Sequence, residues 1–160
     1  MLKVTVERTA TIEYTDASGN LIWQLPVGSV AVFAEYTNPN GPLLDDYFLV
    51  FAFMEGDQWF VRTASFYANG RDEMLEALSA QWRVPLRFGL CASTDWKSRV
   101  IWPEELADQE YFTFTELPAK SLFERLQRRC IGKVYEYSPS AAVQGYVDSR
   151  LRPSAPRQSL

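Results

Sequence analysis

DYFLVFAFME, residues 46–55, is the stretch that decides the fold. In an extended strand, successive side chains point to opposite faces of the sheet. Here both sets are apolar, with Tyr47, Leu49, Phe51 and Phe53 on one side and Phe48, Val50, Ala52 and Met54 on the other. A strand that is apolar on both faces lies in the middle of a sheet and is covered on both sides. Residues 55–58 then make a tight connection to the next strand, so we expect an antiparallel hairpin.

Shorter period-2 patterns lie on both sides of this hairpin. They predict strands at 2–6, 11–15, 21–25, 29–36, 59–67, 87–92, 97–102 and 111–115, and a last one around Tyr135 and Tyr137. Apolar residues at helical spacing predict one helix from about Arg71, ended by Pro85, and a second helix from Pro118 to Gly132. The sequence therefore predicts an α+β fold, a mainly antiparallel sheet of about six to nine strands with two packed helices.

The composition changes after residue 137. Residues 138–160 are rich in Ser, Pro, Ala and Arg and show no clear apolar period, apart from a helical turn near Val143–Val147. We predict a single α+β domain at 1–137 and a loose, flexible basic tail at 138–160.

Charge is distributed unevenly along the chain, although the formal net charge is only −4. The 53 residues from Thr9 to Val61 contain seven acidic residues and no Lys or Arg. From Leu117 to Leu160 the balance reverses, with eight basic residues against three acidic ones. A field of one sign steers partners of the opposite sign and repels others, so this asymmetry is the main functional clue in the sequence.

We expect the N-terminal half to bind a basic protein partner through an exposed surface that is acidic and lined by aromatic side chains. The residues of this predicted surface are Glu35, Tyr36, Asp45, Asp46, Tyr47, Asp57 and Trp59. Immunity, inhibitor and adaptor proteins share this physical character. Nucleic-acid binding favours a basic domain, so the acidic balance argues against nucleic acid as the partner.

Asp95-Trp96-Lys97-Ser98-Arg99 is the densest cluster of polar and aromatic residues. Trp and Arg are frequent anchors of interfaces, and a turn is where binding residues tend to lie, so Trp96 and Arg99 are added to the predicted binding residues. The structural alternative is a cross-strand Trp with a stacked Arg that stabilises a hairpin.

The chain contains no His, which excludes Ser-His-Asp triads, Cys-His pairs and His-ligated zinc sites. It also lacks the glycine-rich phosphate-binding motifs, and we predict no cofactor and assign no catalytic or metal-binding residue. An alternative function is a hydrolase that depends on carboxylates or on a divalent metal ion. Its candidates are Glu35, Asp45, Asp46, Glu55 and Asp57, which equally suit solvated loop and turn positions. A third possibility is a structural subunit of a larger assembly, whose basic tail orders on contact.

Cys91 and Cys130 match no metal or redox spacing, and we expect both to be reduced, buried thiols. The N-terminus alternates like a strand and lacks the apolar core of a signal peptide. The longest apolar run, residues 47–54, is much shorter than the ~20 residues of a membrane helix. These features predict a soluble cytoplasmic protein without membrane contact, and they leave its oligomeric state open.

Overall fold

The computed structural model describes residues 1–6, 10–39, 44–116, 118 and 135–151. In these ranges it has nine strands, two α-helices and two short 3-10 helices. In chain order they are β1 (Leu2–Val6), β2 (Ala10–Thr15), β3 (Leu21–Pro26), η1 (Val27–Ser29), β4 (Val30–Thr37), β5 (Tyr47–Glu55), β6 (Gln58–Ser65), α1 (Arg71–Trp82), β7 (Lys97–Trp102), η2 (Glu104–Leu106), β8 (Phe112–Glu116), β9 (Tyr135–Pro139) and α3 (Ala141–Leu151). The predicted α+β class is confirmed.

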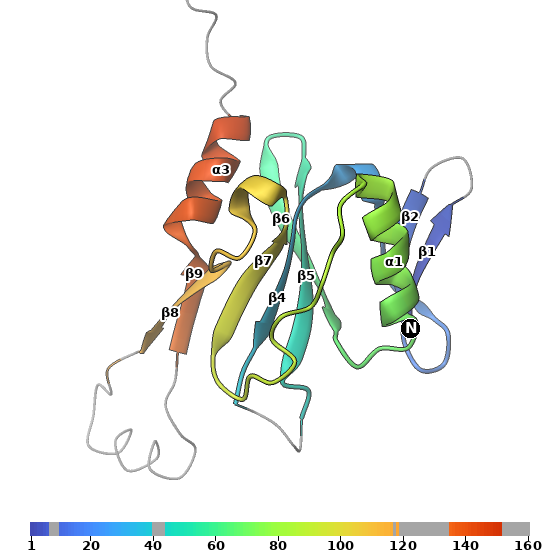
Figure 1. The fold of residues 1–160 in the computed structure, drawn as a ribbon, viewed down its shortest axis with the longest axis horizontal. Helices are drawn as coiled ribbons and strands as arrows, with labels where there is room; N and C mark the ends of the chain where they lie inside the picture. Colours follow the sequence, from blue (N-terminus) through green and yellow to red (C-terminus); the bar gives the residue numbers. More distant parts are fainter. Residues whose placement is uncertain (7–9, 40–43, 117, 119–134, 152–160) are drawn as a thin grey trace, which may run out of the picture.

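All strand pairs are antiparallel. The central sheet has the order β6-β5-β4-β7, and two smaller sheets have the orders β1-β2-β3 and β8-β9. The two smaller sheets and the two helices lie on opposite sides of the central sheet, with α1 and β1-β2 on one side and α3 and β8-β9 on the other (Figure 1). We call the face of the central sheet toward α1 the first face and the face toward α3 the second face.

Each face of the central sheet carries its own apolar core, because β5 presents large apolar side chains in both directions. Phe51 is fully buried on the first face and packs with Phe33, Leu78 and Trp23. Val50 is fully buried on the second face, in a cluster with Tyr111 and Val143. The prediction that residues 46–55 form a central strand covered on both sides is confirmed.

The predicted strand at 87–92 is wrong. Leu86, Phe88 and Leu90 do alternate and all pack on the first core, but they belong to a segment without regular secondary structure. Two backbone groups of this segment, the N–H of Gly89 and the carbonyl of Arg87, bond to the side chains of Glu35 and Arg99 in the central sheet instead of to a neighbouring strand.

The C-terminal part is more regular than a single helical turn. The structure places β9 at Tyr135–Pro139 and an eleven-residue helix, α3, at Ala141–Leu151, with Val143 and Val147 buried against the second face. The expected turn near Val143–Val147 is therefore part of a longer helix. The domain boundary at 137 and the tail itself stay predictions, and residues 152–160 lie outside the described residues. So does the predicted helix from Pro118 to Gly132, apart from Pro118.

Within the described ranges, no helix is long and apolar enough to cross a membrane.

Candidate functional site

A buried ion pair lies on the first face, two residues from the end of β4. Glu35, in β4, has no exposed side-chain surface and accepts hydrogen bonds from the Nε of Arg99 at 2.7 Å and from the backbone N–H of Gly89 at 2.8 Å. The hydroxyl of Tyr47 donates a third hydrogen bond to the other carboxylate oxygen. A buried carboxylate needs this degree of compensation, because an unpaired charge in an apolar interior is very costly.

Burial and hydrogen bonding in this network shift the pKa values of Tyr47 and Arg99. Burial is the largest cause that raises the pKa of Tyr47 above its ordinary value, and the hydrogen bond to Glu35 adds to it. For Arg99, burial acts to lower the pKa, but the hydrogen bond and the charge of Glu35 outweigh burial and raise it. Tyr47 therefore stays protonated and Arg99 stays charged at physiological pH.

The network fastens the irregular segment 83–96 to the central sheet. Arg99 donates a second hydrogen bond to the carbonyl of Arg87 and pairs with Asp108 at 2.6 Å. Its guanidinium passes so close to Gly89 that a Cβ at residue 89 would lie 2.7 Å from Nε and Cζ. Gly89 is thus the residue that lets the segment approach the ion pair.

Register then brings two distant loops together at one end of the central sheet. Thr37, the last residue of β4, pairs with Tyr47 of β5 and with Lys97 of β7. The residues just before those partners therefore flank the end of β4. The Thr37 hydroxyl donates to the Asp95 carbonyl at 2.7 Å, and Asn38 N–H donates to the Asp46 carbonyl at 2.8 Å.

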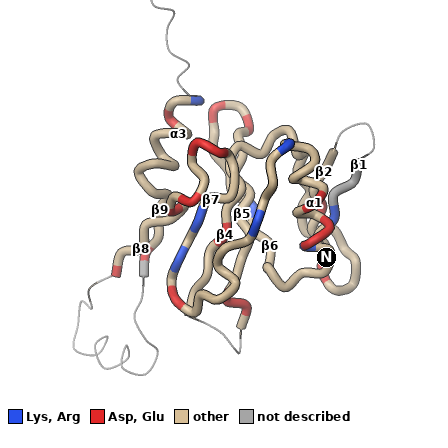
Figure 2. The backbone as a smooth tube through the Cα atoms, viewed as in Figure 1, with Lys and Arg blue, Asp and Glu red and all other residues tan. Residues whose placement is uncertain are grey.

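We call this end of the sheet the loop end. It consists of Asp45, Asp46, Tyr67, Cys91, Asp95 and Trp96. Asp45 and Asp95 are exposed, and none of the three aspartates forms an ion pair within the described residues. Figure 2 shows acidic positions at the beginnings of both β5 and β7, where this end lies.

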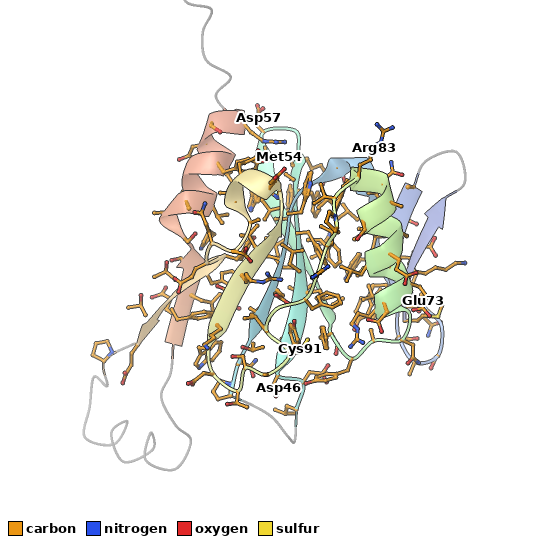
Figure 3. The ribbon with its side chains drawn as sticks, in the orientation of Figure 1. Asp46, Met54, Asp57, Glu73, Arg83 and Cys91 are labelled. Atoms are coloured by element: carbon orange, nitrogen blue, oxygen red, sulfur yellow. The ribbon has the colours of Figure 1, made fainter. Side chains whose placement is uncertain are left out.

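Tyr67 and Cys91 complete the loop end. Tyr67 is 58% exposed, and its hydroxyl donates to Asp46 at 2.6 Å. This hydrogen bond is the largest cause that raises the pKa of Tyr67. Cys91 is a free and exposed thiol, so the expectation that it is buried is wrong. Figure 3 shows Cys91 and Asp46 at the same end of the molecule.

A row of aromatic rings runs from the loop end onto the second face. Its members are Trp96, Phe114, Phe112, Tyr36 and Phe48, with successive ring centroids 5.0 to 6.1 Å apart. All but Phe112 are half-buried, so part of each ring remains accessible. Burial, and next the charge of Tyr137, raise the pKa of Tyr36 to about 12, so this ring is neutral. We call this group the aromatic row.

The nine predicted binding residues therefore do not form one surface. Asp45, Asp46, Trp96 and Tyr36 do gather at the loop end and in the aromatic row. Glu35 and Tyr47 were expected to be exposed, but both are buried, and Arg99 points inward to Glu35. These three residues therefore hold the structure next to the loop end and do not form part of its surface.

Asp57 and Trp59 lie elsewhere. They flank the β5–β6 turn at the opposite end of the sheet, and Figure 3 shows Asp57 far from Asp46. The expected single acidic patch over all these residues is wrong, because Asp45 and Asp46 precede the nine-residue strand β5, whereas Glu55 and Asp57 lie at its other end.

Sequence reasoning did not assign Tyr67 or Cys91 to a site. Tyr67 follows β6 and meets Asp46 across 21 residues of sequence, a contact that only the β5–β6 register fixes. An available signal was that the predicted hairpin brings the start of one strand beside the end of the next, so that residues 46 and 67 become neighbours.

The described residues contain no group of three or more His, Cys, Asp or Glu side chains placed to hold a metal ion. Asp45 and Asp95 are exposed and Asp46 is half-buried, which suits charge-guided contact with another molecule better than acid–base catalysis. Comparisons with protein-family models, with curated proteins and with solved structures found no match to this chain, so only its own geometry bears on function.

Proposed function

We propose that this protein is an interaction module that binds a basic protein partner with its loop end and aromatic row, as immunity, inhibitor or adaptor proteins do. The observation that carries the proposal is that the end of β4 holds both loops, because Thr37 bonds to the carbonyl of Asp95 and Asn38 to that of Asp46. The buried Glu35–Arg99 pair holds the same segment further along, at Gly89 and Arg87. Fixed loops lose little conformational entropy on binding, so a surface held in this way is suited to recognition.

The two kinds of side chain have separate roles. Exposed aspartates attract a cationic partner from a distance and raise the association rate, while contributing little to the final affinity at the rim. Half-buried rings such as Trp96 and Tyr36 supply the apolar area that a partner can cover, which slows dissociation. The partner is therefore expected to carry Lys or Arg around an apolar centre.

The test compares two charge-matched variants after a partner has been captured with the native chain. The first changes Asp45, Asp46 and Asp95 to Asn, and the control changes the exposed Glu104, Glu105 and Glu110 to Gln. Both remove three negative charges, so any difference reports position and not net charge. Surface plasmon resonance should show the association rate falling about tenfold in the first variant only, with a weaker dependence on salt.

A Trp96→Ala variant tests the aromatic part. It should leave the association rate near that of the native chain and raise the dissociation rate, because an anchor acts after encounter. Equal association rates for the native chain and the triple Asn variant, or equal losses in both charge variants, would refute the loop end as the binding surface.

A further inference from the structure

We infer that the outer edge of β6 is a second binding site, which accepts an extended, basic peptide segment of a partner as an added antiparallel strand. This inference concerns the end of the sheet opposite the loop end and does not depend on the function proposed there.

The open edge follows from the topology. β6 is the first strand of the central sheet and, within the ranges that the structure describes, it pairs only with β5. An edge strand presents unpaired N–H and C=O groups, which a strand from another chain can bond.

Two side-chain contacts show which residues of β6 point outward. The indole N–H of Trp23 donates to the carbonyl of Thr63 at 3.0 Å, and the backbone N–H of Ser65 lies 3.5 Å from the hydroxyl of Tyr14. In an antiparallel pair the residues that bond the partner alternate with residues that point both backbone groups away. Thr63 and Ser65 therefore point away from β5, and by the same alternation so do Trp59 and Val61.

β6 is thus covered in one half and open in the other. Trp23 and Tyr14, from the β1-β2-β3 sheet, cover the edge at Thr63 and Ser65. No hydrogen bond of the described chain uses the outward backbone groups of Trp59 and Val61. Val61 is exposed, and these two residues offer four backbone groups, enough to hold a short added strand.

The surroundings of the open half select the chemistry of the peptide. Glu55, the last residue of β5, and Asp57, in the turn that follows, are exposed, and neither has an ion pair within the described residues. A pocket of about 350 Å³ opens on the first face beside Arg62. Its lining is Gln24, Leu25, Pro26, Ser29, Phe53, Met54, Glu55 and Arg62.

A peptide that fits would place an apolar side chain over this pocket and Lys or Arg beside the turn acids. A strand of alternating apolar and basic residues meets both requirements, because its alternate side chains point to the same face. A second copy of this chain fits less well. Antiparallel pairing of two β6 edges would set the β5–β6 turn of one copy against Trp23 of the other, which covers the adjoining half.

The experiment uses randomised peptides displayed on phage, selected on the full chain, followed by synthesis of the most enriched peptide. We expect alternating apolar and basic residues in the enriched set. In the native chain, hydrogen exchange of the Trp59 and Val61 amides should be fast without peptide and slow with it, because these amides bond to solvent until a strand is added.

Val61→Pro is the decisive variant, with Val61→Thr as its matched control. Proline removes an N–H that points away from β5, so the fold keeps its internal hydrogen bonds, while the added strand loses one of its anchors. The Kd of the peptide should rise at least about tenfold for Val61→Pro and change little for Val61→Thr. A peptide N-methylated at alternate amides tests the same bonds without changing the protein, and it should bind as weakly.

Three results would overturn the inference. The first is a selection that enriches no peptide, and the second is an enriched peptide that binds Val61→Pro as tightly as it binds the native chain. The third is protection of the Trp59 and Val61 amides from hydrogen exchange when only the protein concentration is raised, which would assign the edge to a second copy. Replacing Asp45, Asp46 and Asp95 by Asn should leave peptide binding unchanged, which separates this site from the loop end.

Discussion

The two faces of the central sheet differ in how they treat buried polar groups. On the first face, the carboxylate of Glu35 accepts three hydrogen bonds, from Arg99, Gly89 and Tyr47. On the second face, the buried hydroxyl of Tyr146 has no hydrogen-bond partner among the described residues, and the buried indole N–H of Trp59 and hydroxyl of Tyr111 make no more than a weak contact with each other. On the first face, buried polar groups hold a loop against the sheet, whereas the second face holds α3 mainly by apolar packing.

This difference has an energetic meaning. A buried polar group without a partner lowers the free energy of unfolding by about 1–3 kcal/mol. A compensated ion pair destabilises the fold strongly only when one of its members is removed. Removal of one member of the ion pair on the first face should therefore be costly and affect the loop end, and removal of the hydroxyls of Tyr111 and Tyr146 on the second face should cost little.

Glu35→Ala should have the largest effect. It leaves the Arg99 guanidinium partly buried without its main partner and frees the N–H of Gly89, which should lower the free energy of unfolding by about 3–5 kcal/mol. Urea denaturation measures the loss. Glu35→Gln keeps an acceptor for Gly89 and should cost less. If both variants unfold at the urea concentration of the native chain, the ion pair does not hold the first face together.

Gly89→Ala should come next. Its Cβ would lie 2.7 Å from the Arg99 guanidinium, so the segment or the ion pair must shift, at a cost of about 1–3 kcal/mol for overpacking. The control is Gly28→Ala, where nothing lies within 4 Å of the added Cβ. The thermal unfolding temperature should fall for the first variant and stay close to the native value for the second. A Gly89→Ala variant as stable as the native chain would mean that segment 83–96 can move away from the sheet at little energetic cost.

These two residues also show what the sequence could and could not predict. The central strand at 46–55 was predictable because a strand that is apolar on both faces must lie inside a sheet that is covered on both sides. The segment 87–92 also resembles a strand in sequence, but its Gly89 N–H and Arg87 carbonyl bond to the side chains of Glu35 and Arg99 instead of to a neighbouring strand. No local sequence pattern predicts such a replacement. Glu35 itself looked like a surface acid, since its partner Arg99 is 64 residues away.

The candidate site was predictable to a similar extent. Charge bias pointed to Asp45 and Asp46, and the polar-aromatic cluster pointed to Trp96, yet their meeting at one end depends on the pairing of β4 with both β5 and β7. The same charge bias wrongly grouped Asp57 with them, because composition along a chain does not say at which end of a strand a residue lies. Topology decides that, and a single sequence carries topology only weakly.

The smallest expected effect tests the second face. Burial raises the pKa of Tyr111 to about 12 from the ordinary value of 10.0, so the unfolded chain loses this proton first as the pH rises. The difference in pKa has almost no effect on stability below about pH 10 and destabilises the fold above it, by about 1 kcal/mol at pH 11. Tyr111→Phe removes this contribution, so the stability difference between variant and native chain should grow from pH 9 to pH 11. At pH 7 the variant should be as stable as the native chain or more stable by about 1 kcal/mol, since the hydroxyl that it loses makes no more than a weak contact with the indole N–H of Trp59. A loss of stability at pH 7 would show instead that the hydroxyl is bonded, for example to a buried water, and the two faces would then treat their polar groups alike.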